Sequence, residues 1–82
     1  MDKYLIITEE GDMQIRRGGE APDLEELQSI VQGNIDIINH DRWKIWVNEE
    51  GAINGMKPNP VASAFCRTNQ TLYGPVLIRY SP

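Results

Sequence analysis

Lys44, Trp46 and Asn48 are the residues whose types and spacing best suit ligand chemistry. They alternate within residues 43–48, so on a β-strand they would place a cation, an aromatic ring and an amide on one face. A nucleobase stacked on an aromatic side chain gains about 1–3 kcal/mol. These residues therefore predict a site for a nucleotide-like ligand. A second interpretation stays open, in which one tryptophan of this run lies in the core and the other fills an interface between subunits.

Residues 57–67 add groups that suit phosphate. Asn59 is a good helix N-cap and Pro60 suits the first helical position, which predicts a short helix over about residues 60–66. Backbone N–H groups at a helix start and nearby positive charge both favour anions. Lys57, Asn59 and Arg67 are therefore predicted to complete the ligand site, with the cations facing phosphate and the amides reading polar edges. Asn side chains also hold turns and cap helices, and this structural interpretation stays open for both Asn48 and Asn59.

Glu49 and Glu50 are the candidates for acid–base catalysis or magnesium binding. The chain repeats their pattern, because Glu9-Glu10-Gly11 also follows an apolar, strand-like run. Two such units are most simply two hairpin turns with solvated carboxylates, and adjacent strand residues point to opposite faces. The sequence therefore predicts no catalytic residue. A small hydrolase that uses Glu49 or Glu50 stays open as an alternative function, ranked below the two binding hypotheses given at the end of this section.

Charge is distributed unevenly along the chain. The formal net charge is −4, from twelve acidic residues and eight lysines and arginines. All twelve acids lie in the first fifty residues, which carry −7 because they hold five bases, while Lys57, Arg67 and Arg79 give the rest of the chain +3. The acid-free C-terminal third fits an anion site. The acidic balance of the whole chain disfavours nucleic acid as a partner.

Length and cysteine content limit how the chain can be stabilised. A chain of 82 residues predicts one domain, 1–82, that buries about 60% of its unfolded surface. Cys66 is the only cysteine and His40 the only histidine, so the sequence offers neither an internal disulfide nor a zinc site, and it predicts no cofactor. Self-association is another common source of stability for so small a domain, which favours a homo-oligomer.

The apolar runs of the sequence are short. None approaches the length of a membrane span, and the first residues have too short an apolar run for a signal peptide. A lone thiol fits a reducing compartment. The sequence therefore predicts a cytoplasmic protein without a membrane partner.

The clearest secondary-structure element is a helix over about residues 23–32. Asp23 and Glu26 have the spacing of a capping box, and Gly33 suits the helix exit. Apolar residues at helical spacing form the face that is expected to cover a sheet: Leu24, Leu27, Ile30 and Val31.

Strands are predicted on both sides of this helix. Residues 3–8 and 13–16 form two strands joined by a turn, and residues 34–39, 43–48 and 76–80 form three more. Ala52 and Ile53 are candidates to pair back onto residues 43–48, and residues 68–74 form a loop or a weak strand. The order ββαββαβ predicts an α+β, two-layer domain with a mainly antiparallel sheet and helices against one face.

A spaced set of residues carries a resemblance to a known family. The set runs from the helix to the last strand: Leu24, Leu27-Gln28, Val31, Gly33, Ile35-Asp36, Asn48-Glu49-Glu50-Gly51, Gly55-Met56, Asn59, Ala62 and Gly74. Over about residues 23–80 the chain resembles a family of small phage and bacterial proteins catalogued as domain of unknown function 3846. The chain departs from that family at residues 32, 34 and 36, where the family usually has Gly, an aromatic residue and Glu.

The resemblance implies no activity, because the family has none assigned, but it implies a phage or mobile-element setting. Small proteins in that setting often act against host defences. The leading hypothesis is therefore a non-enzymatic binding protein in the host-cell cytoplasm that counteracts bacterial defence by sequestering an anionic, nucleotide-like signal. The alternative is a protein–protein interaction module that masks a host defence protein.

Overall fold

The structure is a computed structural model that describes residues 3–16, 21–40, 43–67 and 69–80. Its elements follow the chain in this order: β1 (Lys3–Ile7), β2 (Met13–Arg16), α1 (Leu24–Val31), β3 (Ile35–His40), β4 (Trp43–Asn48), α2 (Pro60–Phe65) and β5 (Val76–Tyr80). The predicted order ββαββαβ and the α+β class are confirmed. No helix in the described ranges is long and apolar enough to cross a membrane.

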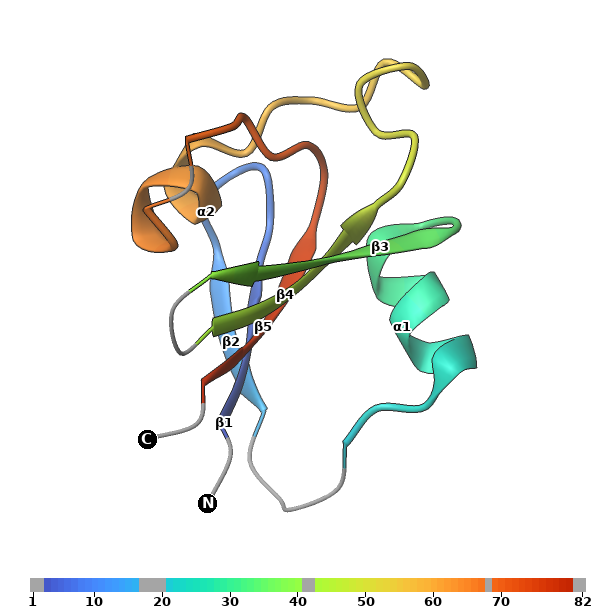
Figure 1. Ribbon diagram of the computed structural model, residues 1–82, viewed down its shortest axis with the longest axis vertical. Coiled ribbons are helices and arrows are strands. Elements are labelled where there is room, and N and C mark those ends of the chain that lie inside the picture. The colour runs from blue at the N-terminus through green and yellow to red at the C-terminus, as the bar shows by residue number, and fades with distance from the viewer. Residues whose placement is uncertain (1–2, 17–20, 41–42, 68, 81–82) are drawn as a thin grey trace.

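The five strands named above form one antiparallel sheet in the order β2-β1-β5-β4-β3 (Figure 1). β5, the last strand in sequence, lies at the centre between β1 and β4. β1 is interior, as the apolar character of both its faces predicts. Because β5 pairs with β1 and β4, residues from the two ends of the chain become neighbours, and Lys3 pairs with Tyr80.

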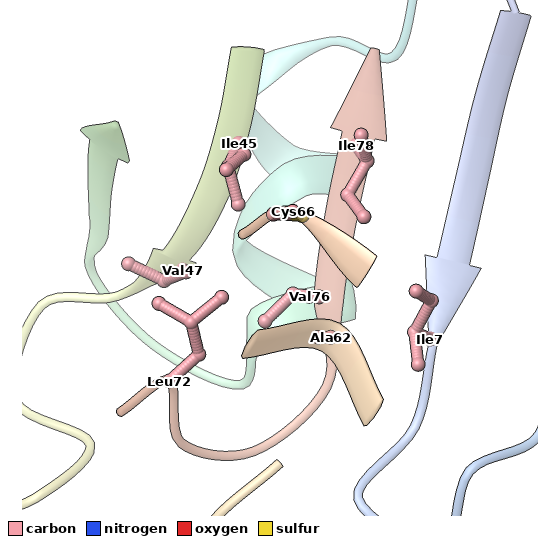
Figure 2. Close-up of a cluster of buried hydrophobic side chains, with 8 residues drawn as sticks. All are labelled: Ile7, Ile45, Val47, Ala62, Cys66, Leu72, Val76 and Ile78. Carbon is pink, nitrogen blue, oxygen red and sulfur yellow. The ribbon is translucent and has the colours of Figure 1, made fainter. Parts of the chain in front are cut away.

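The sheet carries an apolar core on each of its faces. Successive strand residues point to opposite faces. Ile45 and Ile78 therefore pack in one buried cluster with Ala62 of α2, shown in Figure 2, where α1 passes behind the strands. Trp46 and Leu77 pack in the other cluster, with α1.

The two helices thus lie on opposite faces of the sheet. α1 covers its face as the sequence predicted, but α2 covers the other face instead of joining α1. The physical reason is that Ile45, Val47 and Val76 are apolar and point to the face opposite α1. The chain after β4 crosses to that face, where Ala62 and Cys66 pack on them and bury them.

Helix α1 begins as its sequence predicts. Asp23 is the N-cap, and its carboxylate accepts a hydrogen bond of 2.8 Å from the backbone N–H of Glu26. Leu27 and Val31 are buried against the sheet, whereas Leu24, in the first turn, is 59% exposed, because the sheet does not extend under this end of the apolar face. At the other end Gln32, not the glycine after it, takes the left-handed conformation with φ 65°.

The two Glu-Glu-Gly segments both form turns. Thr8 closes the first one by accepting from the N–H of Gly11 at 2.9 Å, and Gly11 supplies the positive φ of 89°. In the second, residues 51–55 continue as turns, and the N–H of Met56 donates to the C=O of Gly51 at 2.9 Å. The predicted pairing of Ala52 and Ile53 onto β4 is therefore wrong. Of residues 68–74, the described part forms one isolated bridge, from Tyr73 to Pro58.

Cys66 provides a test of the core under α2. The residue is 1% exposed, and burial raises the pKa of its thiol from the ordinary 9.0 to about 11. Because the thiolate is the reactive form, this shift lowers its fraction at pH 8 about a hundredfold. We expect a thiol reagent to modify the native protein at least about a hundredfold more slowly than the urea-unfolded chain, and equal rates would contradict this packing.

The same shift gives a pH dependence. Between pH 9 and about 11 the thiol stays protonated in the folded protein and ionises in the unfolded chain, so this contribution to stability is complete below pH 9 and is lost as the pH rises. As the pH is raised from 9 to about 11, the free energy of unfolding of Cys66→Ala should therefore fall less than that of the unsubstituted chain.

Candidate functional site

A row of cationic side chains crosses the sheet on the face that α1 covers. Tyr4 pairs with Arg16 of β2 on one side and with Arg79 of β5 on the other, and Arg79 pairs in turn with Lys44 of β4. Directly paired residues of an antiparallel sheet point to the same face. Tyr4 packs in the cluster under α1, which fixes the face. We call these four paired residues, the cations Arg16, Arg79 and Lys44 with Tyr4 between the two arginines, the cationic row.

Arg79 lies near the end of β5, the central strand of the sheet, and is partly buried. Its Nε is buried and makes no hydrogen bond. Most buried polar atoms of native proteins have a hydrogen-bond partner. A donor without one has lost its hydrogen bonds to water on burial, and no new bond offsets this unfavourable free energy. The cost is higher for a charged group. The guanidinium of Arg79 is therefore held partly out of water, with one donor that no described group satisfies.

The other cations of the row differ in their surroundings. Arg16 forms an ion pair with Glu26 of α1, and this hydrogen bond raises the pKa of the guanidinium. It is the only ion pair in the ranges that the structure describes. Nζ of Lys44 lies 5.5 Å from the centroid of the Trp46 ring. Arg79 and Lys44 therefore remain as adjacent positive charges without a carboxylate among the described residues.

Trp46 does not offer an open ring. Its side chain is 7% exposed and packs under α1 with Leu27, Val31 and Leu77. The predicted stacking surface is therefore covered, because α1 occupies the space that a base would need. Trp43, on the opposite face, is the less buried tryptophan of the pair.

Asn48 connects the end of β4 to the end of α1. Its Nδ2 donates to the carbonyl oxygens of Val31 at 3.1 Å and Gln32 at 3.2 Å, and its Oδ1 accepts from the N–H of Glu50 at 2.8 Å. A Cβ at Gly33 would lie 2.7 Å from this Nδ2, so glycine permits the close approach. The amide is thus engaged in holding the turn after β4 and the helix exit, which is the structural interpretation of this residue.

Asn59 is fully buried at the start of α2, with 0% exposure. Its Oδ1 accepts from the N–H of Ala62 at 3.0 Å, and its Nδ2 donates to the carbonyl oxygens of Ile7 at 3.0 Å and Gly74 at 2.8 Å. The predicted N-cap is confirmed. This geometry also corrects the predicted phosphate contact at the helix start, because the asparagine itself fills that position below the surface.

Lys57 and Arg67 lie apart from the cationic row. Both are exposed and flank α2, which covers the other face of the sheet. Of the six residues predicted to bind ligand, the structure brings only Lys44 and Trp46 into contact. Arg79 and Arg16 were not predicted as site residues. Arg79 is the one charged residue in an otherwise apolar segment, Val76–Tyr80, and this is the only sequence signal that points to it.

Glu49 and Glu50 are both exposed in the turn that follows β4. The backbone N–H of Glu50 donates to Asn48, which is a structural contact. Among the residues whose structure is described, no group of three or more His, Cys, Asp or Glu lies close enough together to hold a metal ion.

These features define a small α+β domain with a five-stranded antiparallel sheet between two helices and a cationic row on one face. The chain belongs to the family described as Domain of unknown function (DUF3846), whose model matches residues 2–81. This confirms the resemblance seen in the sequence and extends it to the first two strands. No curated protein and no solved structure matches the chain.

Proposed function

We propose that this chain is a non-catalytic binding protein that holds an anionic, nucleotide-like small molecule on the cationic row. The observation that carries the proposal is the buried, unpaired Nε of Arg79. A phosphate oxygen is the acceptor that suits a guanidinium best, since charge-assisted bonds from arginine to phosphate can be bidentate. Because this Nε has almost no accessible surface, the Arg79 side chain would turn toward the ligand on binding, and the phosphate would then give the donor the partner that the described residues do not supply.

The register of the sheet supports the same ligand. Lys44 stands directly opposite Arg79 on β4 and β5, and like charges in this position destabilise a sheet. An anion between these two side chains would turn that repulsion into attraction. The pairing of Arg16 with Glu26 leaves the positive charge concentrated at Arg79 and Lys44.

The ligand is recognised chiefly through its phosphates. The rings of Tyr4 and Trp46 lie beside the two cations but are 4% and 7% exposed, so they do not present a face for stacking. In the phage or mobile-element setting that the resemblance implies, removal of such a ligand from solution would counteract a host defence signal.

Thermal denaturation with added nucleotides tests this proposal. ATP, a cyclic dinucleotide and inorganic pyrophosphate are the probes, and adenosine is the uncharged control. A ligand at a hundred times its Kd adds about 2.7 kcal/mol of stability, which raises the Tm of a domain this size by about 10–20 °C. We expect at least one phosphorylated probe to do this and adenosine to have no effect.

Two lysine variants locate the binding. Lys44→Gln should reduce the rise in Tm, whereas Lys57→Gln, an exposed lysine outside the row, should not. A protein that none of the phosphorylated probes stabilises at millimolar concentration would contradict the proposal. Capture of one stoichiometric protein partner under the same conditions would then favour the masking alternative.

A further inference from the structure

An apolar groove lies on the other face of the sheet, beside α2. Its volume is about 360 Å³. The residues that line it come from four strands, β1, β2, β4 and β5, and from the end of α2. It opens on the face opposite the side chains of the cationic row, because Leu5, Ile78 and Trp43 belong to the cluster opposite α1. Tyr4 borders the groove from β1, although its side chain packs on the α1 face.

The register shows how the groove is built. Leu5 of β1 and Ile78 of β5 are paired and form its floor, and Ile15, paired with Leu5 on the other side, forms one wall. The opposite wall is aromatic. The ring of Trp43 lies 4.8 Å from that of Tyr80 and 5.2 Å from that of Phe65, measured between centroids.

The apolar side chains of the groove are unusually open. Met13 is 47% exposed, Ile15 65% and Phe65 40%, and all three line the same groove. Contiguous exposed apolar surface of this kind marks a binding site more often than scattered apolar residues do. The volume lies at the lower end of the range of about 300–1,000 Å³ that small-molecule sites occupy.

Charge appears at one place in the lining. Lys3 is the only charged residue among those that line the groove, and it is paired with Tyr80 in the last described row of β1 and β5. A lysine can lay its methylene stem along apolar surface while its ammonium group stays in water. A ligand whose apolar part fills the groove would therefore place a negative headgroup next to Lys3.

We propose that this groove binds a small amphipathic anion, with an apolar chain or ring between Ile15 and Trp43 and a carboxylate or similar headgroup at Lys3. Burial of the apolar part drives binding, and Lys3 selects an anion over an uncharged analogue. The site is independent of the proposed nucleotide site, since the two lie on opposite faces of the sheet.

Decanoate, kept below the concentration at which it forms micelles, and decanol, kept below its solubility limit, are suitable probes. The chain has two tryptophans, so their indole N–H signals in ¹H–¹⁵N NMR spectra report on the two faces of the sheet separately. We expect both probes to shift the signal of Trp43 saturably, with one ligand per chain, and to leave the signal of Trp46 unchanged.

Three variants make the test specific. Ile15→Glu should weaken binding of both probes at least about tenfold, because it places a charge in the apolar wall. Lys3→Gln should weaken decanoate about threefold to fivefold, as an exposed ion pair permits, and leave decanol unchanged. Ile53→Glu, at a residue that is 84% exposed and outside the groove, is the matched control and should change neither affinity.

Three results would overturn the proposal. The first is the absence of a saturable shift with either probe. The second is an Ile15→Glu variant that binds decanoate as well as the unsubstituted chain does. The third is a Trp43 signal that depends on protein concentration alone while sedimentation shows a dimer, because a second copy of the chain would then cover the groove. Failure of the nucleotide test would leave these outcomes unaffected.

Discussion

Replacement of Asn59 with alanine is expected to lower the free energy of unfolding by about 3–7 kcal/mol. The substitution removes the cap of α2, which is worth about 1 kcal/mol, and leaves the buried carbonyls of Ile7 and Gly74 without their donor at about 1–3 kcal/mol each. Small domains have a total stability of about 5–15 kcal/mol, so this variant should be close to unfolding. Urea denaturation followed by circular dichroism measures the change.

Two further variants separate the roles of Asn59. Asn59→Asp keeps an oxygen that accepts from Ala62 but directs a carboxylate at two carbonyl oxygens, so we expect a loss at least as large as that of alanine. Asn54→Ala changes an exposed asparagine in the preceding turn and should cost less than about 0.5 kcal/mol. An Asn59→Ala protein within 1 kcal/mol of the unsubstituted chain would show that this amide does not hold α2 to the end of β1 and to the segment that precedes β5.

Replacement of Arg79 with methionine is expected to weaken the binding of a phosphorylated ligand about 10- to 100-fold without loss of stability. A hydrogen bond to a charged group contributes about 1.5–3 kcal/mol, and loss of this bond accounts for the expected 10- to 100-fold decrease in affinity. The second expectation follows from the buried Nε, because an apolar side chain of similar length removes an unpaired donor from the central strand of the sheet. Calorimetric titration and urea denaturation of the same preparation measure the two quantities.

The matched control is Arg67→Met. Arg67 is exposed after α2 and outside the cationic row, so its replacement should change neither affinity nor stability. If Arg79→Met destabilises the fold by several kcal/mol, the arginine has a structural role that the proposal does not include. If affinity is unchanged in a well-folded Arg79→Met protein, the ligand binds elsewhere.

Local patterns were sufficient to predict most of the elements. The alternation of residues 43–48 and 76–80 gave β4 and β5 with the bounds that the structure shows, because strand periodicity and the flanking turn residues are local properties. Asp23 and Asn59 marked the starts of both helices for the same reason. The exposed position of Leu24 was missed, since helical spacing does not show where along a helix the contact with the sheet begins.

The candidate site could be predicted only in part, because it depends on pairing between distant segments. Lys44 was predicted, but its neighbour Arg79 depends on the central place of β5, which no local pattern gives. Trp46 and Asn48 were assigned to a ligand because their strand face was expected to be open, and α1 covers it. The apolar groove depends on the same strand order and on the place of α2 opposite α1.

The Nε–Hε signal of Arg79 in ¹H–¹⁵N NMR spectra tests the central claim most directly. A buried Nε–H without a partner should give its own signal, and a phosphate oxygen that accepts from it should move that signal downfield in a saturable manner as ATP or pyrophosphate is added. The account predicts this shift, with the same Kd as the rise in Tm and with no effect of adenosine. A stationary Arg79 signal during a titration in which either phosphorylated ligand binds would contradict it.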